Sequence, residues 1–165
     1  TITHVAVKKI NNGVKDCFET LPNISIEKDE RNCLVINAPN LNNERIVTND
    51  IVELVSDKEF KWLGRYDNVI NSGGIKLLPE QIERKLSSVL DQRYFVTGVP
   101  DDLLGQKLIL LIEGKNEDTD LSERIKTLAT LEKHEVPKDI FFVEKFVETV
   151  NGKVSRQKTL QEILK

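Results

Sequence analysis

The chain has 165 residues, of which 39% are hydrophobic and 31% are charged, and its formal net charge is −3. This composition is typical of a soluble globular protein, and the small negative charge argues against nucleic acids and anionic membranes as partners. No apolar run is long enough to cross a membrane, and the two cysteines, Cys17 and Cys33, lack metal-binding spacing. We therefore expect a cytoplasmic protein with no metal site in this chain. The chain contains no Met, even at position 1, so we also expect it to be part of a longer protein.

The first third of the chain predicts short strands separated by turns. Residues 1–10 alternate apolar and polar side chains, and an Asn-Asn-Gly turn follows them. Further β-rich runs cover residues 24–26, 33–36 and 45–55, and residues 60–63 alternate again. Turns at this spacing are typical of a small barrel or sandwich, so we expect an all-β subdomain here.

A glycine pair separates two apolar runs in the middle of the chain. Val69 and Ile70 precede Ser72-Gly73-Gly74, and residues 75–78 are largely apolar again. Short runs around a Gly-Gly turn predict a β-hairpin. Glycine permits positive φ and lets a ligand approach the backbone closely, so this turn is either a plain surface hairpin or a ligand contact.

After the hairpin, helices and strands alternate. The predicted helices cover residues 79–90, 121–131 and 156–165, and the predicted strands cover residues 94–99, 108–112 and 140–143. Asp120, with Glu123 three residues later, is typical of a helix N-terminal cap. Residues 108–112 are apolar throughout, which predicts a strand covered on both faces. The expected fold class is α+β: a small all-β subdomain in residues 1–65, then a compact α+β domain in residues 66–165 with a mixed sheet, the hairpin and about three helices.

Four stretches of the chain carry distinctive combinations of residues. Residues 62–74 read Trp-Leu-Gly-Arg-Tyr-Asp-Asn-Val-Ile-Asn-Ser-Gly-Gly, and residues 47–50 read Val-Thr-Asn-Asp. Residues 99–107 begin Val-Pro-Asp-Asp, and residues 148–156 read Glu-Thr-Val-Asn-Gly-Lys-Val-Ser-Arg. In their order and approximate spacing these stretches resemble motifs of the adenylate-forming superfamily. That superfamily includes acyl-CoA synthetases, firefly luciferases and peptide-synthetase adenylation domains.

The resemblance implies that residues in both parts of the chain act on ATP. Asp50 would accept hydrogen bonds from the ribose hydroxyls, and Arg65 would bind the ribose with it. Asn49 stands where the superfamily has Gly, and Asn tolerates positive φ, so the turn of this motif can be retained. Lys153 would bridge the α-phosphate and the carboxylate of the acid; the alternative is a solvated surface lysine. Val147 replaces the usual Pro of the lysine motif.

The resemblance also implies a mobile lid. Asp67 would be the hinge around which residues 66–165 rotate, and Gly73 and Gly74 would line the tunnel for the pantetheine arm of CoA. His4 is a candidate substrate contact, although a histidine in a strand more often has a structural role.

The implied enzyme is an AMP-forming acid–CoA ligase that uses ATP, CoA and Mg²⁺ to make an acyl-adenylate and then a thioester. Its phosphate loop and Mg²⁺ ligands would lie in the N-terminal domain of the same chain, outside these residues, so the isolated fragment should be inactive. Within the superfamily, residues 1–7 and 67–76 most resemble the o-succinylbenzoate–CoA ligases of menaquinone biosynthesis.

Other functions stay open beside this one. The chain can belong to another acyl-CoA synthetase, or it can be a non-catalytic interaction domain that keeps the lid fold. A small RNA-binding domain is disfavoured, because aromatic residues make up only 5% of the chain and basic residues are not in excess. The sequence leaves the oligomeric state open.

Overall fold

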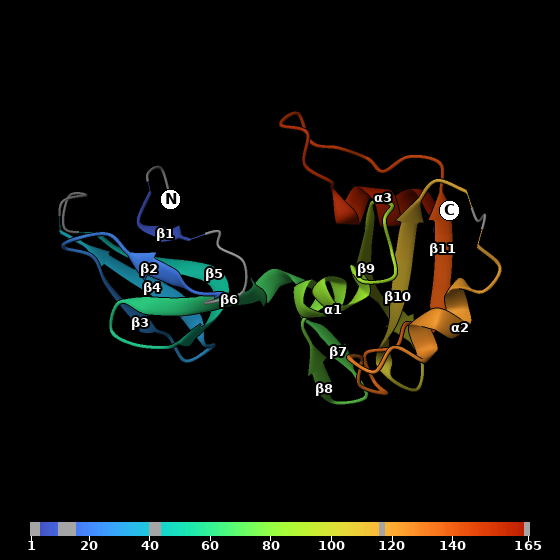
Figure 1. Ribbon diagram of the computed structural model, residues 1–165, viewed down its shortest axis with the longest axis horizontal. Helices are drawn as coiled ribbons and strands as arrows, with labels where there is room; N and C mark the ends of the chain where they lie inside the picture. Colours follow the sequence, from blue (N-terminus) through green and yellow to red (C-terminus); the bar gives the residue numbers. More distant parts are fainter. Residues whose placement is uncertain (1–3, 10–15, 40–43, 116–117, 164–165) are drawn as a thin grey trace. The chain divides into compact units, whose positions relative to one another are not determined.

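The computed structural model describes residues 4–9, 16–39, 44–115 and 118–163, and it divides into two compact units (Figure 1). Unit 1 comprises Thr1–Asn68 and unit 2 comprises Val69–Lys165. Each unit has its own sheet and its own hydrophobic core. The α+β fold class expected from the sequence is confirmed. That unit 1 belongs to a larger domain and that unit 2 is a mobile lid stays a prediction.

Unit 1 is a six-stranded antiparallel sheet in the order β1-β2-β6-β5-β4-β3. Its strands are β1 (Ala6–Lys8), β2 (Phe18–Thr20), β3 (Ser25–Lys28), β4 (Cys33–Ala38), β5 (Glu44–Leu54) and β6 (Glu59–Arg65). The core on this sheet contains Ile24, Leu34, Ile36, Ala38, Val52 and Phe60. A short 3₁₀ turn, η1 (Tyr66–Asn68), ends the unit. Among the described residues, no helix of either unit is long and apolar enough to cross a membrane.

The strand expected over residues 1–10 is β1 alone, and residues 1–3 and 10 lie outside the described part of the chain. Strand β2 was not expected from the sequence. It is only three residues long, and its pairing with both β1 and β6 places it in the sheet. A strand this short is defined by its neighbours, because three residues carry almost no periodic signal of their own.

Unit 2 is a five-stranded mixed sheet covered by helices. Its strands are β7 (Ile70–Ser72), β8 (Ile75–Leu77), β9 (Tyr94–Asp101), β10 (Gly105–Glu113) and β11 (Asp139–Val143). Only the β10–β11 pair is parallel among these strands; the other pairs are antiparallel. The helices are α1 (Pro79–Leu86), α2 (Leu121–Lys126) and α3 (Arg156–Ile163).

Strand β10 is the centre of unit 2. Its residues 108–112 are all buried, which confirms the strand predicted to be covered on both faces. The side chains alternate between two cores, as the strand period requires. Leu108, Leu110 and Ile112 belong to the core shared with α1 and α2, whereas Ile109 and Leu111 belong to the core shared with α3.

The helices are shorter than the sequence predicted. Helix α1 ends at Leu86 instead of residue 90, and the hydroxyls of Ser87 and Ser88 donate to the carbonyls of Arg84 and Lys85. Serine hydroxyls that bond nearby carbonyls compete with the helical pattern, which is a physical reason for this early end.

Helix α2 also departs from the prediction. It ends at Lys126 instead of residue 131, where the hydroxyl of Thr127 donates to the carbonyls of Glu123 and Arg124. The predicted cap is wrong, because the side chain of Asp120 makes no capping hydrogen bond. Instead, the carboxylate of Asp118 accepts the Asp120 amide at 2.9 Å and pairs with Arg124. Helix α3 ends at Ile163, and residues 164–165 lie outside the described part.

Candidate functional site

A β-bulge brings two side chains of β6 to Asp50 on β5. Asp50 pairs with Arg65 and Ile51 pairs with Gly64, but the register then shifts, so that Val52 lies opposite Trp62. In a regular strand, positions 62 and 65 would face opposite sides of the sheet, whereas the extra residue of a bulge re-aims the side chains around it. The Nε1 of Trp62 donates to Asp50 Oδ1 at 3.1 Å, and Arg65 donates to the same oxygen at 3.4 Å.

This arrangement leaves half of the Asp50 carboxylate available. All hydrogen bonds that the described residues donate to the carboxylate end on Oδ1, and the side chain is 31% exposed. A carboxylate held in this way can accept further hydrogen bonds from vicinal hydroxyls through Oδ2.

Asp67 lies in η1 and is fixed to unit 1 by two side chains. Arg65 donates to Asp67 Oδ2 at 2.9 Å, and the amide nitrogen of Asn49 lies 3.0 Å from Oδ1 and 3.3 Å from Oδ2. The hydrogen bond to Asp67 raises the pKa of Arg65, while partial burial acts in the opposite direction. Asp50, Arg65 and Asp67, three of the residues predicted for the site, therefore form one connected group.

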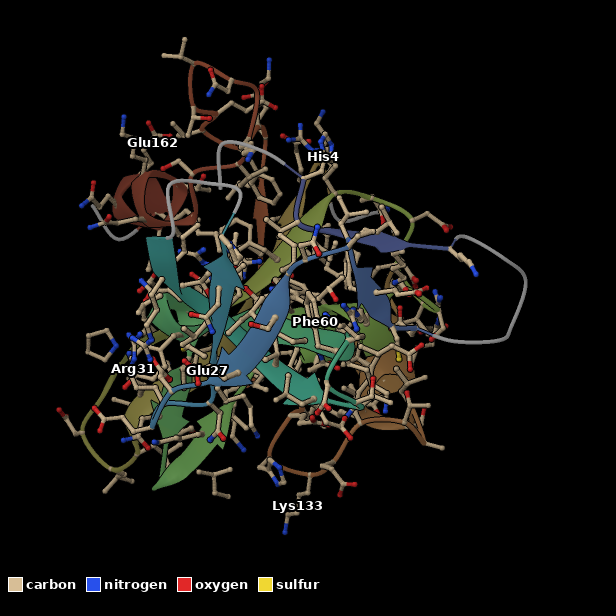
Figure 2. The ribbon with its side chains drawn as sticks, turned by 90° about the vertical axis from the view of Figure 1, so that its left-hand side faces the viewer. His4, Glu27, Arg31, Phe60, Lys133 and Glu162 are labelled. Carbon is tan, nitrogen blue, oxygen red and sulfur yellow. The ribbon has the colours of Figure 1, made fainter. Side chains whose placement is uncertain are left out.

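Asn49 does not behave as the sequence suggested. It lies within β5 and is not among the residues with positive φ. Its side chain instead bridges Asp67 and Arg31, which donates to Asn49 Oδ1 at 3.0 Å. Arg31 also lies over the ring of Tyr66, with 5.1 Å from its Cζ to the ring centroid. Figure 2 shows Arg31 at the periphery of unit 1. The superfamily motif has Gly at this position, so the Asn49 side chain adds contacts to the turn that carries Asp67.

His4 is exposed and lines the same hollow of unit 1 as Asp50 and Trp62. The hollow has a volume of about 400 Å³. Its other lining residues are Val5, Ala6, Phe18, Leu34, Ile36, Thr48 and Phe60, so it is mostly apolar. Figure 2 labels His4 and Phe60. The structure therefore brings His4 and Asp50 to one hollow, and a role of His4 in binding substrate stays a prediction.

The glycine pair of unit 2 forms the turn between β7 and β8, as predicted. Gly73 has φ +59° and Gly74 has φ +82°, the left-handed values that a two-residue hairpin turn requires. The amide of Gly73 donates to the carbonyl of Leu104 at 2.8 Å, which fixes the turn against the β9–β10 connection. A Cβ atom on Gly74 would meet no atom within 4 Å, so the backbone is open to an approaching molecule.

Lys153 lies in the connection between β11 and α3. The amide of Gly152 donates to the carbonyl of Thr149 at 2.9 Å, and the amide of Lys153 lies 3.2 Å from Thr149 Oγ1. Gly152 has φ +72°, which allows this tight turn. The side chain of Lys153 is exposed, and its ammonium makes no hydrogen bond or ion pair with any described residue.

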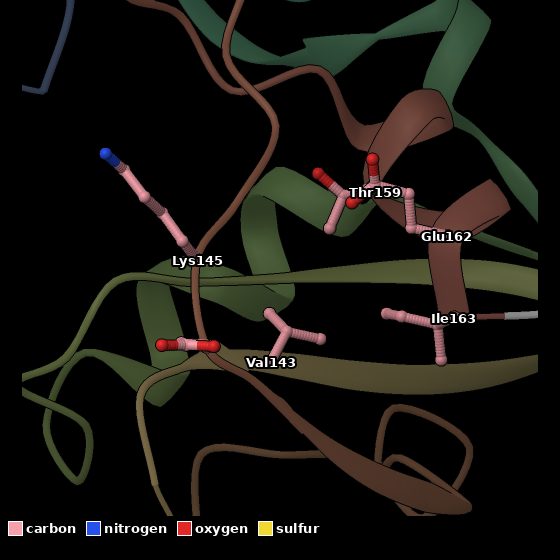
Figure 3. Close-up of a pocket in the computed structure, with 6 residues that line it drawn as sticks. Val143, Lys145, Thr159, Glu162 and Ile163 are labelled. Atoms are coloured by element: carbon pink, nitrogen blue, oxygen red, sulfur yellow. The ribbon is translucent and has the colours of Figure 1, made fainter.

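The two predicted sites of unit 2 are not brought together. Figure 1 shows the β7–β8 hairpin at one end of the unit and the connection before α3 at the other end. A larger hollow of about 690 Å³ lies beside α3, but it is lined by none of the residues predicted for the site. Figure 3 shows Val143 and Ile163 of this hollow facing each other and Lys145 extended away from them.

Trp62 and Arg31 are residues that the sequence interpretation left without a role. Trp62 stands in the hinge stretch, but its bond to Asp50 depends on the bulge, which has no signal in the sequence. Arg31 precedes Asn49 by 18 residues, so only strand pairing reveals their contact. Within the described ranges, no group of three or more His, Cys, Asp or Glu side chains could hold a metal ion.

Comparison with known proteins finds acyl-CoA ligases, each of which resembles this chain over part of its own length. No family model matches the chain. The chain is 31% identical over 132 residues to VraA of Staphylococcus aureus, which is named provisionally as a long chain fatty acid–CoA ligase; the match covers 75% of this chain and 27% of VraA. A crystal structure of an acyl-CoA synthetase (AMP-forming)/AMP-acid ligase II-like protein from Dyadobacter fermentans is 35% identical, with a TM-score of 0.56. That match covers 98% of this chain and 48% of the other. The chain corresponds to the C-terminal part of a member of the AMP-forming acyl-CoA ligase superfamily.

This result confirms the superfamily that the sequence motifs predicted, and the chain spans 27% of the length of VraA. A structure of an E. coli MenE variant with bound OSB-AMS is 23% identical and has a TM-score of 0.65. It matches 89% of this chain and 35% of the MenE chain. At this identity the structural similarity shows a shared fold alone. The closer resemblance to o-succinylbenzoate–CoA ligases that the sequence suggested therefore stays a prediction.

Proposed function

We propose that this chain is the C-terminal part of an AMP-forming acid–CoA ligase. In the first reaction, a carboxylate oxygen of the acid attacks the α-phosphorus of ATP, giving an acyl-adenylate and pyrophosphate. In the second, the thiol of CoA attacks the acyl carbon, giving the thioester and AMP. The observation that carries the proposal is Lys153, an exposed lysine with no partner among the described residues, on a connection whose backbone is held by hydrogen bonds.

In this proposal Asp50 binds the ribose of ATP. Trp62 and Arg65 hold one oxygen of its carboxylate, which leaves Oδ2 to accept from the ribose hydroxyls. The Asp50 side chain can therefore bind the ribose without breaking its hydrogen bonds to Trp62 and Arg65. Mg²⁺, when bound, would neutralise phosphate charge, and its ligands would lie in the N-terminal domain of the full-length protein, outside these residues.

Lys153 would act on the first reaction alone. The acid and the α-phosphate are both negatively charged, and an ammonium between them stabilises the charge that develops as they approach. The glycine turn would act on the second reaction, because Gly74 leaves open backbone along which the pantetheine arm can pass.

The separation of these two sites supports a rotating lid. Because Lys153 and the glycine turn lie at opposite ends of unit 2, one fixed orientation of the unit cannot present both to the same reacting atoms (Figure 1). We infer that unit 2 turns between the two reactions, with Asp67 as the hinge. The turn η1, which carries Asp67, ends at the boundary between the two units.

The acid proposed as substrate is o-succinylbenzoate. Residues 1–7 and 67–76 resemble o-succinylbenzoate–CoA ligases, so o-succinylbenzoate stays the candidate acid, and the comparisons support the acid–CoA ligase class without favouring one acid. ATP–pyrophosphate exchange by the full-length protein, measured with a panel of fatty, dicarboxylic and aromatic acids that includes o-succinylbenzoate, will identify the substrate. Lack of exchange with every acid would favour the non-catalytic interaction domain.

Lys153→Ala tests the proposed role of the lysine. We expect adenylation to fall on the order of 10²–10³-fold, as when one preorganised electrostatic donor is removed, while thioester formation from a supplied acyl-adenylate continues. Pyrophosphate release times the first reaction and CoA consumption times the second. Lys145→Ala removes another exposed lysine of the same unit and should change neither rate. Equal losses in both reactions, or no loss in the first, would remove Lys153 from the mechanism.

A further inference from the structure

Lys153 belongs to a short hairpin between β11 and α3. The amide of Thr149 donates to the carbonyl of Lys153 at 2.7 Å, and Glu148 and Val154 form an antiparallel bridge. These adjacent rungs fix the backbone of Lys153 relative to the base of the hairpin. The location of the ammonium therefore depends on how firmly that base is attached to unit 2.

The base of the hairpin is tied to α3. The amide of Ser155 donates to the carbonyl of Val147 at 2.8 Å, and the amide of Val147 donates to Thr159 Oγ1 at 3.0 Å. Thr159 lies in α3 and is only 2% exposed. Any shift of α3 on the sheet would therefore move the hairpin, and Lys153 with it.

Arg156, the first residue of α3, attaches the helix to the sheet and to α1. Its two terminal nitrogens lie 2.8 and 2.9 Å from the two carboxylate oxygens of Glu83 in α1. It also donates to the carbonyl of Val96 in β9 at 3.1 Å, and its Cζ lies 5.5 Å from the centroid of the Phe95 ring. A bidentate pair of this kind fixes the relative orientation of the two side chains as well as the distance between them.

Glu83 is itself held in place. Its Oε1 accepts the amide of Val96 at 2.9 Å, and its side chain is 18% exposed, against 27% for Arg156. Burial raises the pKa of Glu83, while the charge of Arg156 opposes that rise. Arg156 also lies 3.9 Å from a carboxylate oxygen of Glu80. The pair thus joins α1, β9 and α3 in a largely enclosed place.

A second arginine contacts the hairpin, but from the surface. Arg93 lies 2.8 Å from Glu148 and 3.2 Å from Glu113, and its side chain is 48% exposed. Exposed pairs contribute little, because solvent screens them and their long side chains lose freedom. The enclosed Arg156–Glu83 pair is therefore the stiffer of the two attachments.

We propose that the Arg156–Glu83 pair is a positioning device that holds the Lys153 hairpin in the geometry for adenylation. This inference rests on the role proposed for Lys153. Neither Arg156 nor Glu83 has to touch ATP or the acid, since they act through the hairpin base. A displacement of about 1 Å in a positioned group can cost about 100-fold in rate, so a loosened base should affect adenylation strongly.

The test compares Arg156→Met, Arg156→Lys and Glu83→Gln in the full-length protein. We expect Arg156→Met to slow adenylation by about 100-fold and to leave thioester formation from a supplied acyl-adenylate largely intact. Arg156→Lys should slow adenylation less than Arg156→Met, because lysine keeps the positive charge but cannot bind both carboxylate oxygens at once. Glu83→Gln should slow adenylation by a factor similar to that of Arg156→Lys. Arg124→Met is the matched control: Arg124 also pairs with an acid, Asp118, and with a backbone carbonyl, that of Val89, away from the hairpin.

A double variant separates positioning from a general loss of structure. On the Lys153→Ala background, Arg156→Met should add almost no further loss of adenylation, since the group that it positions is already absent. The proposal would be overturned if Arg156→Met slowed adenylation by the same factor in the wild-type protein and in the Lys153→Ala variant. Equal losses in both half-reactions would also overturn it.

A measurement on this chain tests the positioning even if the proposed function fails. A wild-type protein that adenylates no acid would contradict the ligase function alone. Hydrogen exchange then decides the positioning: Arg156→Met should speed exchange of the Thr149 and Ser155 amides, which donate to the carbonyls of Lys153 and Val147, and leave the amides of β10 protected. Unchanged exchange in the hairpin would refute it.

Discussion

At the scale of the residue, one carboxylate organises the turn between β3 and β4. Asp29 Oδ1 accepts the amides of Arg31 at 2.8 Å and Cys33 at 2.9 Å, and its Oδ2 accepts Arg31 Nε at 2.9 Å. Partial burial acts to raise the pKa of Asp29, but these hydrogen bonds outweigh it and lower the pKa below 3.8. Arg31 also donates a hydrogen bond to Asn49 Oδ1, and Asn49 in turn donates to Asp67, so this turn also supports the position of Asp67.

The lowered pKa of Asp29 makes its contribution to stability dependent on pH. The folded pKa is below the unfolded value, so the contribution is complete above about pH 3.8 and is lost as the pH falls through the folded pKa. We expect Asp29→Asn to lower the melting temperature at pH 7 and to lower it progressively less below about pH 3.8. Thermal unfolding of this chain from pH 7 to pH 2 measures the difference. A deficit that stays constant over this range would contradict the assignment.

At the scale of the element, the β7–β8 turn depends on two left-handed residues. An L-residue with a side chain loses roughly 1–2 kcal/mol in this conformation, whereas Asn tolerates it. We expect Gly74→Ala to destabilise unit 2 by about that amount. Gly73→Ala should cost somewhat more, because its Cβ would lie 3.2 Å from Leu104 Cδ2. Urea unfolding measures both, and Gly74→Asn should cost least. Equal stability of all three variants would show that backbone strain does not limit the turn.

Elements with a strong local pattern could be predicted from the sequence. The run 108–112 is apolar at every position, and the Gly-Gly turn has few alternative conformations, so both were placed correctly. The ends of α1 and α2 were not, because serine and threonine hydroxyls at those ends bond to nearby carbonyls. The bulge that brings Trp62 and Arg65 to Asp50 arises from pairing between strands, which a linear reading of either strand cannot reveal.

At the scale of the whole molecule, the proposed catalytic cycle needs backbone motion between the units. The side chain of Asp67 is bound to Arg65 and Asn49 of unit 1, one residue before that unit ends. The site residues of unit 1 are close in the fold, and sequence similarity could suggest them together. The opposite placement of Lys153 and the glycine turn on unit 2 appears only in three dimensions (Figure 1).

Asp67→Pro separates backbone motion from these side-chain contacts. Proline fixes φ near −65°, and a hinge works by changing its backbone angles, so the full-length variant should be held in one orientation of unit 2. We expect one half-reaction to fall on the order of 100-fold more than the other. Asp67→Ala removes the contacts to Arg65 and Asn49 but keeps the backbone free, so it should change the two half-reactions by similar, smaller factors. Pyrophosphate release and CoA consumption from a supplied acyl-adenylate measure the two rates. If Asp67→Ala reproduces the pattern of Asp67→Pro, the side-chain contacts govern the cycle, and if both half-reactions of Asp67→Pro keep wild-type rates, the hinge lies elsewhere.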